Sequence, residues 1–349
     1  MLRKWIFILR TCNLDDYSNI DPVSRWLIIT RACVFVMTVI SALLGGFYVL
    51  EHYSLNWFNF ILVVAGLILA HAANNLVNDY YDLKFKVDTE GYVREEYSPH
   101  PITSGLISEK GLILLVLVMD IIDFFIALYL SVTVSWSIML FAVIGLAISV
   151  FYVAPPLKLK YRGLGEAAIF FIWGPLIIGG TIIAIGGKLD WRGWLFTIPY
   201  GLAVTAVVVG KHLDKLEKDR EKGVHTLPVI LGKERGILLM KILVISFYLV
   251  IFLFPLLKVT GWWIYLTYLS IPVTMRLFKT LNAPTPVDKH EAFKLAEDVI
   301  PRDLKEKYSP DDPDAEVPLW PLWYVAWGVW WIRITGGVFL LSLLIDLIF

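Results

Sequence analysis

The chain has 349 residues, of which 58% are hydrophobic and 18% are charged. This composition is too apolar for an ordinary soluble domain, and the chain is too long for a single membrane anchor, so it indicates a polytopic membrane protein. Basic and acidic side chains balance at a formal net charge of zero, which gives no indication of a nucleic-acid partner.

The N-terminal segment shows neither a secretion signal nor a cysteine framework. Asp15, Asp16 and Asp21 follow only a short apolar run, so we predict no cleavable signal peptide. We expect neither a disulfide framework nor a metal site from Cys12 and Cys33.

Nine apolar runs have about the length that a helix needs to cross a bilayer, roughly 20 residues. We therefore predict an all-α, polytopic membrane helix bundle of about nine transmembrane helices, which form one domain over residues 1–349. The predicted spans are 25–49, 57–77, 111–132, 135–153, 165–187, 194–210, 236–256, 260–276 and 320–347. The last run begins with several tryptophans, which are typical of a membrane–water interface.

Basic residues mark one side of the predicted bundle. The connections after the second, fourth, sixth and eighth spans hold 21 Lys and Arg residues, against three in the opposite connections. By the positive-inside rule, we predict that the basic connections and the N-terminus are cytoplasmic, in an integral protein of the cytoplasmic membrane.

The connection over about 277–318 is long enough to count as a cytoplasmic insertion. Its apolar spacing between Asp288 and Ile300 predicts a surface helix between two loops. This helix is expected to be a solvated connector or, alternatively, a cap over the site.

The second span ends in a polar stripe. His71, Asn74, Asn75, Asn78, Asp79 and Asp82 share one helix face, and Asp88 follows after a turn. Polar side chains at membrane depth usually face the bundle interior and mark a site. Oxygen ligands of this kind suit Mg²⁺ with a phosphate-bearing substrate, whereas the alternative is a solvated helix end.

A second acidic segment follows the sixth span. It contains Lys211, His212, Asp214, Glu217 and Asp219. Two acid-bearing helix ends on one side could hold two cations on one diphosphate, although alternating charges also suit a salt-bridged surface turn.

Basic residues lie where they could meet phosphate. Lys158 and Arg162 follow the fourth span, and Arg31 lies within the first. Arg can bind phosphate with two hydrogen bonds, while cytoplasmic anchoring explains the loop charges equally well.

These segments resemble the UbiA superfamily of intramembrane prenyltransferases. The resemblance lies in Asn78-Asp-Tyr-Tyr-Asp82 with Asp88, in Tyr161-Arg-Gly-Leu-Gly-Glu166, and in Asp219-Arg-Glu-Lys-Gly-Val-His-Thr-Leu-Pro228. The first of these segments is most similar to the 1,4-dihydroxy-2-naphthoate polyprenyltransferase branch.

The resemblance implies Mg²⁺-dependent transfer of a polyprenyl group from its diphosphate to an aromatic acceptor such as 1,4-dihydroxy-2-naphthoate, in quinone biosynthesis. It implies catalytic roles for Asp79, Asp82 and Asp219, and two Mg²⁺ ions held by Asp79, Asp82, Asp88, Asp214, Glu217 and Asp219. Substrate would contact Arg31, Asn75, Asn78, Lys158, Arg162, Lys211 and His212. The expected partners are a prenyl diphosphate, a lipophilic or aromatic acceptor and membrane lipid.

The second segment departs from the family pattern. Lys215 stands where the first acid is expected, and Asp214 comes one residue early. In a straight helix, Asp214 and Asp219 would stand about 140° apart. Either the segment unwinds there, or Glu217 substitutes, or the second cation is held differently.

Other functions stay open from the sequence. The acceptor could instead be geranylgeranylglyceryl phosphate in ether-lipid synthesis, a carotenoid or a chlorophyllide. A CDP-alcohol phosphotransferase is disfavoured because its Asp-Gly-x-x-Ala-Arg start is absent. A transporter or a non-catalytic membrane relative is the third class.

Overall fold

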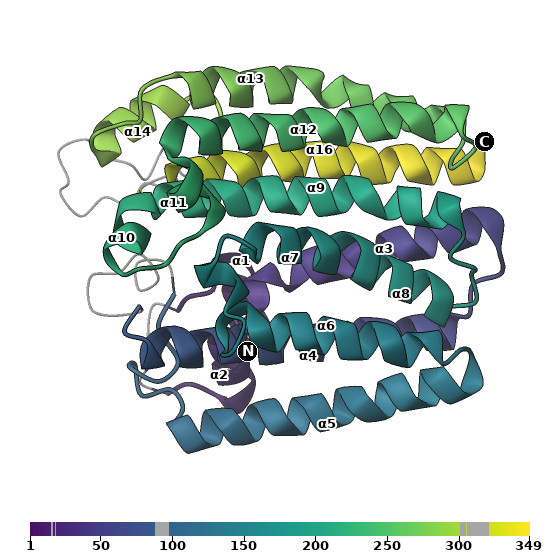
Figure 1. Ribbon diagram of the computed structural model, residues 1–349, viewed down its shortest axis with the longest axis horizontal. Coiled ribbons are helices and arrows are strands. Elements are labelled where there is room, and N and C mark those ends of the chain that lie inside the picture. Colours follow the sequence, from purple (N-terminus) through teal and green to yellow (C-terminus); the bar gives the residue numbers. More distant parts are fainter. Residues whose placement is uncertain (15–16, 18, 88–97, 301–304, 306–320) are drawn as a thin grey trace.

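The computed structural model describes residues 1–14, 17, 19–87, 98–300, 305 and 321–349. Within those residues every regular element is a helix, and the one β-bridge, between Arg162 and His225, is isolated. The long helices run roughly parallel to one axis and stack into a bundle (Figure 1). The all-α bundle predicted from the sequence is confirmed.

The helices follow one another along the chain with short connections. The first part holds α1 (Leu2–Thr11), α2 (Pro22–Ile29), the 3₁₀ turn η1 (Ala32–Val34), α3 (Phe35–His52), α4 (Trp57–Lys84) and α5 (Glu109–Thr133). The middle part holds α6 (Ser137–Val153), η2 (Leu159–Tyr161), α7 (Gly165–Phe171), the π-helical turn η3 (Ile172–Leu176), α8 (Ile177–Ala184), α9 (Trp191–Asp214) and α10 (Leu216–Glu221). The last part holds α11 (Leu227–Leu231), α12 (Lys233–Leu256), the 3₁₀ segment η4 (Trp262–Ser270), α13 (Ile271–Asn282), α14 (Lys289–Ala296) and α16 (Trp323–Ile348).

Seven helical segments of the described chain are long and apolar enough to cross a membrane. They are Ala32–His52, Trp57–Lys84, Glu109–Thr133, Gly165–Ala184, Trp191–Asp214, Lys233–Leu256 and Trp323–Ile348. The two other predicted spans correspond to α6, which has 17 residues, and to η4 with α13, where the helix type changes at Ile271. The protein is an integral membrane protein, and the predicted count of nine spans is not confirmed.

The span Gly165–Ala184 is interrupted by a π-helical turn that contains Pro175. Proline has no backbone N–H and its ring clashes with the preceding turn, so it disrupts the regular α-helical hydrogen bonding. The turn therefore divides this span into α7 and α8.

Helix α9 forms the centre of the bundle, and α5 forms its edge. In α9, 72% of the most apolar stretch is buried inside the protein, against 17% in α5. A Cβ at Gly210 of α9 would lie 2.9 Å from the backbone oxygen of Tyr324 in α16, so glycine permits this close helix contact. The ends of α9 are consequently held by neighbours on several sides.

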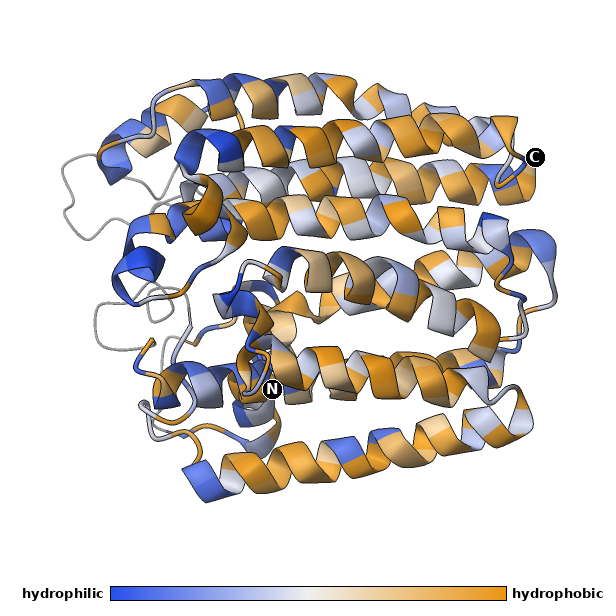
Figure 2. Ribbon diagram, viewed as in Figure 1, coloured by the Kyte–Doolittle hydropathy of each residue, from blue (hydrophilic) through white to orange (hydrophobic). Residues whose placement is uncertain are grey.

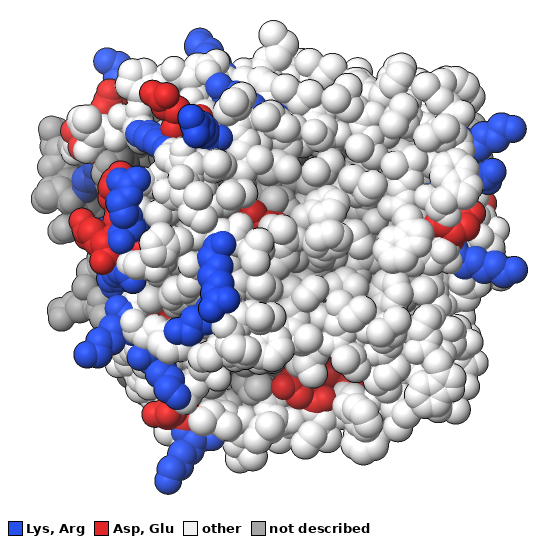
Figure 3. All heavy atoms as spheres, viewed as in Figure 1, with Lys and Arg blue, Asp and Glu red and all other residues white. Residues whose placement is uncertain are grey.

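Polar and charged residues gather at the ends of the bundle, whereas the middle is apolar (Figure 2). Figure 3 shows most Lys and Arg side chains of the visible face at one end, at left, with fewer at the other. The left end carries α10, α11 and the end of α4 (Figure 1). This asymmetry agrees with the uneven loop charges of the sequence.

The tryptophans that begin α16 lie inside the bundle rather than at an interface. Trp323, Trp327 and Trp331 are at most 2% exposed. The indole N–H of Trp331 donates to Thr274 Oγ1 at 2.8 Å. For these three residues the predicted interfacial position is wrong, because their i, i+4, i+8 spacing turns them toward the core.

The surface helix predicted after Asp288 is confirmed as α14, which Asp288 caps by accepting the N–H of Glu291 at 2.8 Å. Ala292 and Ala296 are fully buried against the core. An ion pair also joins Arg276 in α13 to Asp298, with an N–O distance of 2.6 Å. The helix is therefore docked on the bundle and is not a solvated connector.

The two cysteines form a disulfide between Cys12, after α1, and Cys33 in η1. The sequence did not predict this pairing, because 21 positions separate the cysteines and no local pattern indicates that the intervening chain doubles back.

Candidate active site

The polar stripe of the second predicted span faces the protein interior. Helix α4 continues without interruption from the apolar core to Lys84, as its sequence predicts. Asn75, Asp79 and Asp82 are between 2% and 8% exposed. The alternative of a solvated helix end is therefore excluded for these residues.

Arg31 lies beside the first of these acids. It occupies the turn between α2 and η1, and its Nη2 lies 3.3 Å from Asp79 Oδ1. The same nitrogen donates to the backbone oxygen of Asn75 at 3.0 Å, while Asn75 Nδ2 donates to the backbone oxygen of Thr30 at 2.8 Å. The predicted residues Arg31, Asn75 and Asp79 thus form one contact group.

Asp82 contacts the connection after α6. Its carboxylate accepts from Lys160 Nζ at 2.7 Å and from the Tyr161 hydroxyl at 2.8 Å. The sequence analysis had selected Lys158 and Arg162 from this connection. Lys158 Nζ lies 3.5 Å from the centre of the Phe85 ring, and Arg162 donates to the backbone oxygen of Pro156 at 3.2 Å. Spacing alone does not show which of three neighbouring cations meets the acid.

The ends of α4 and α10 have the same backbone geometry. The N–H of Val87 donates to the backbone oxygen of Asp82, and the N–H of Val224 donates to that of Asp219, each at 2.8 Å. The residues before these valines, Lys86 and Gly223, are left-handed, with φ of 58° and 69°. Both helices therefore end in a Schellman turn that starts at an acid.

These two turns pack against each other. Val87 and Val224 are 1% and 0% exposed and form a small apolar cluster with Phe85 and Tyr161. Lys222 Nζ also donates to the backbone oxygen of Val87. The two acidic segments are consequently parts of one site.

Tyr152, near the end of α6, lies between the two acidic segments. Asp82, Asp219, Lys160 and Glu166 all act on its hydroxyl electrostatically. Tyr152 and Lys160 were not predicted as site residues, because their proximity to the acids depends on tertiary packing.

Only one of the three predicted acids of the second segment is buried at this site. Asp219 is 1% exposed. The helix breaks at Lys215, but both oxygens of Asp214 accept backbone N–H groups at the start of α16, from Tyr324 and Val325, at 2.8 Å each. The Glu217 side chain is 74% exposed and pairs with Arg220. This geometry argues against Asp214 and Glu217 as metal ligands.

His212 and Glu166 form a buried pair behind the second segment. His212 Nδ1 lies 2.7 Å from Glu166 Oε1, and the N–H of Leu227 donates to the same oxygen at 3.1 Å. Lys211 is half-buried on the neighbouring turn of α9. The pair ties α7 and α11 to the end of α9, next to the acidic turn.

Two buried oxygens near the acids have no hydrogen-bond partner among the residues that the structure describes, namely Asn78 Oδ1 and Glu166 Oε2. Together with the carboxylates of Asp79, Asp82 and Asp219, they provide the oxygen donors that Mg²⁺ prefers. No group of three or more His, Cys, Asp or Glu residues in the described ranges is already arranged around a metal position. Asp88 lies outside those ranges.

An apolar cavity of about 320 Å³ extends from the polar stripe into the bundle. His71 and Asn74 of the stripe lie on its wall, and Ser149 donates to Asn74 Oδ1 at 2.7 Å. The rest of the wall comes mainly from apolar side chains of α4, α5, α6 and the Gly165–Ala184 segment, with Asp120 and Asp123 as exceptions. A cavity of this kind accommodates a hydrocarbon chain.

Fold and site together define an intramembrane enzyme with a buried acidic and basic site at one end of a helix bundle, above an apolar cavity. The UbiA prenyltransferase family model matches residues 38–296. The chain belongs to this family and is a prenyltransferase.

Individual relatives agree with this family. The chain is 23% identical over 261 residues to the 1,4-dihydroxy-2-naphthoate octaprenyltransferase of Bacillus subtilis (strain 168), covering 72% of this chain and 80% of that protein. It is 29% identical over 174 residues to the digeranylgeranylglyceryl phosphate synthase of Natronomonas pharaonis, covering 50% of this chain and 57% of that protein.

The fold has solved counterparts. A UbiA homologue from Archaeoglobus fulgidus, whose structure was determined with GPP and Mg²⁺, is 14% identical with a TM-score of 0.53. The match covers 93% of this chain and all of that one.

Proposed function

We propose that the protein transfers a polyprenyl group from a prenyl diphosphate to an aromatic acceptor such as 1,4-dihydroxy-2-naphthoate, in a Mg²⁺-dependent reaction. The observation that carries the proposal is the convergence of two acid-bearing turns, with Asp82 and Asp219 near Tyr152, at the mouth of an apolar cavity. A substrate that joins a diphosphate to a hydrocarbon chain matches both parts of this site.

In this proposal Asp79, Asp82 and Asp219 hold Mg²⁺, with Asn78 Oδ1 as a further donor. Bound Mg²⁺ neutralises the charge that develops on the leaving diphosphate. The A. fulgidus homologue, whose structure contains GPP and Mg²⁺, supports this cofactor and this substrate class. Asp88 and a second ion stay part of the proposal, whereas Asp214 and Glu217 leave it.

The cationic side chains complete the diphosphate site. Arg31 and Lys160 contact the acids directly, so in the proposed complex they share their charge between carboxylate and diphosphate. Such fixed charges stabilise a developing anion because they need little reorganisation during the reaction. Lys158, Arg162, Lys211 and His212 are proposed to support binding from the rim of the same site.

The cavity has a second role beyond binding the prenyl chain. Ionisation of an allylic diphosphate produces a carbocation, which water would trap. The apolar walls beside His71 and Asn74 exclude water from the chain, so an electron-rich acceptor can form the new bond instead. The chain itself need supply no covalent nucleophile.

The naphthoate acceptor is favoured by the B. subtilis relative. A second acceptor, geranylgeranylglyceryl phosphate, is favoured by the N. pharaonis relative. The two acceptors differ in chemistry, since the first forms a carbon–carbon bond on an aromatic ring and the second forms an ether.

Purified protein should be assayed with geranylgeranyl diphosphate and each acceptor, with and without EDTA. We expect turnover of the naphthoate, its loss with EDTA, and recovery with added Mg²⁺. Asp79→Asn and Asp82→Asn should each lower kcat by about 10²–10³-fold, the usual cost of removing one group that stabilises transition-state charge. Turnover that ignores EDTA, or survives in the variant that carries both substitutions, would refute the mechanism.

A further inference from the structure

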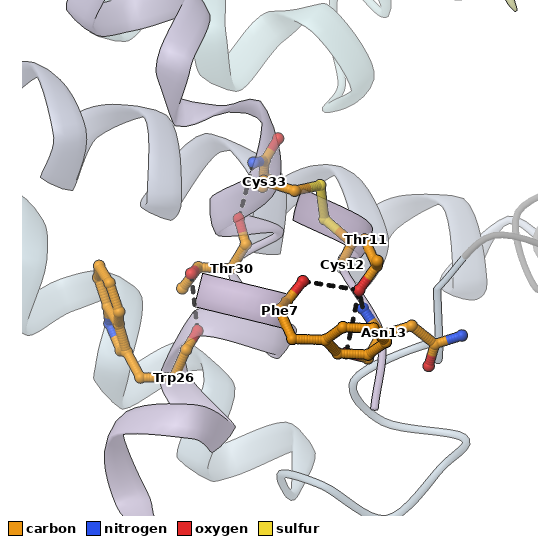
Figure 4. The surroundings of a disulfide bond; sticks show 8 residues. Phe7, Thr11, Cys12, Asn13, Trp26, Thr30 and Cys33 are labelled. Carbon is orange, nitrogen blue, oxygen red and sulfur yellow. Dashed lines mark hydrogen bonds between the residues drawn. A yellow bond between two sulfur atoms is a disulfide. The ribbon is translucent and has the colours of Figure 1, made fainter. Parts of the chain in front are cut away.

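The turn that carries Arg31 is held from two opposite sides. On one side lie Asn75 and Asp79, whose contacts with Arg31 and Thr30 are described above. On the other side, Cys33 is bonded to Cys12, with a Cα–Cα distance of 5.3 Å. Figure 4 shows the bond joining the end of α1 to the chain just after Thr30.

The backbone of Arg31 shows that the turn needs such restraints. Arg31 is left-handed, with φ of 56° and ψ of 50°. A residue with a Cβ atom adopts this conformation at a cost in free energy, so surrounding contacts must maintain it. The disulfide lies two residues away and is the covalent restraint on this turn.

Helix α1 is itself anchored, so the disulfide joins the turn to a fixed point. Ile8 is fully buried and Cys12 is 3% exposed. The indole N–H of Trp5 donates to Asp21 Oδ1 at 3.4 Å, and Asp21 caps α2. Helix α1 and both cysteines lie before residue 38, where the match to the family model begins.

We propose that Cys12 and Cys33 are positioning residues, and that their disulfide keeps Arg31 against Asn75 and Asp79 for diphosphate binding. The proposal rests on the function proposed above. It makes the site sensitive to reduction: a dithiol such as dithiothreitol supplies two electrons and two protons, giving two cysteine thiols and the cyclic disulfide of the reagent. The carboxylate ligands stay in place, but Arg31 loses one of its two restraints.

The first test uses full-length protein in detergent. Alkylation without reductant should leave both cysteines unmodified in mass spectrometry. Reduction, or the double variant Cys12→Ser/Cys33→Ser, should raise KM for the prenyl diphosphate by roughly three- to tenfold, a coupling typical of residues in contact, with kcat changed less than twofold. Reductant should have no effect on the double variant.

The second test separates positioning from general stabilisation. In an Arg31→Ala background, loss of the disulfide should change KM by less than about twofold, because the residue that it positions is absent. An equal rise in KM in both backgrounds, or a lower melting temperature with unchanged KM, would overturn the proposal. Alkylation of both cysteines in the unreduced protein would overturn it as well.

A binding measurement distinguishes this proposal from the proposed function. Stabilisation by a prenyl thiodiphosphate, which ionises slowly, should weaken on reduction of the wild type but not of the Arg31→Ala variant. If no acceptor is prenylated, the proposed function fails, while this measurement still decides whether the disulfide positions Arg31.

Discussion

Single acidic residues of similar sequence context have different roles in the protein. Asp79 and Asp82 contact the cations Arg31 and Lys160, whereas Asp214 accepts two backbone N–H groups of α16. A carboxylate at a helix N-terminus satisfies donors that have no partner within the helix, and it interacts favourably with the helix dipole. The role of Asp214 is therefore structural.

The structural role of Asp214 gives a prediction at this scale. Asp214→Ala should lower the free energy of unfolding by about 0.5–2 kcal/mol, the usual cost of losing such a cap. The kcat of the folded enzyme should change less than twofold. Thermal unfolding and active-site-normalised kinetics measure the two effects.

Glu217→Ala is the matched control, because its side chain is 74% exposed. It should change neither quantity. A large loss of kcat in the Asp214 variant at full stability would return Asp214 to the metal site.

The sequence could not assign Asp214 because its partners follow it by more than a hundred positions. Periodicity places Asp79 and Asp82 on one face of α4, and the structure confirms that face. No local rule shows that α16 begins beside the end of α9. The same limit applies to Lys160 and Tyr152, which reach the acids only through packing.

At the scale of elements, the paired Schellman turns explain two residues of the acidic segments. Gly223 and Lys86 hold equivalent left-handed positions, yet only one of them is glycine. No heavy atom outside the immediate chain lies within 4 Å of a Cβ built at Gly223. Backbone conformation rather than space therefore determines the effect of a substitution there.

These turns predict opposite effects for two substitutions. Gly223→Ala should destabilise the protein by about 1 kcal/mol, and Lys86→Gly should stabilise its turn by up to about the same amount, because glycine alone adopts positive φ without cost. Thermal unfolding of the two variants provides the comparison. Destabilisation by Lys86→Gly would show that the Lys86 side chain makes a contact worth more than the backbone relief.

The docking of α14 predicts a pH dependence. Arg276 donates to Asp298 and holds the pKa of that carboxyl below its ordinary value of 3.8. A lowered folded-state pKa means that the ion pair stabilises the docked helix fully above pH 3.8 and that this stabilisation is lost as the pH falls through the lowered value. Asp298 is 58% exposed, so the effect should be small and should weaken with salt.

The measurement compares wild type with Asp298→Asn, using protease cleavage near α14 as the readout. We expect faster cleavage of the variant at neutral pH and equal rates at the lowest pH. A difference that persists unchanged in strong acid would contradict the role of the ion pair.

At the scale of the whole molecule, apolar periodicity predicted the bundle and most of its helices. It predicted the surface helix after Asp288 but not its burial, since Ala292 and Ala296 are too small to indicate a core contact by themselves. It also missed the disulfide between Cys12 and Cys33. Helices follow from local pattern, whereas the contacts between them depend on the complete fold.

The uneven charge of the two ends predicts the orientation in the membrane. We propose that the end with the acidic turns faces the cytoplasm, together with the N-terminus. Single cysteines placed at Lys218 and at Lys258, in a protein without Cys12 and Cys33, should differ in reaction with a membrane-impermeant maleimide on intact cells. Only the Lys258 position should react, and the reverse result would invert the topology.

The contact between Val87 and Val224 has a consequence for the thermodynamics of ligand binding. Because the two turns already touch in the unliganded protein, a diphosphate does not have to bring them together from separate positions. Binding should therefore carry a small conformational entropy cost and bury little additional apolar surface of the protein at this end. Calorimetry with inorganic pyrophosphate and Mg²⁺ should accordingly show a small change in heat capacity, typical of a preorganised site.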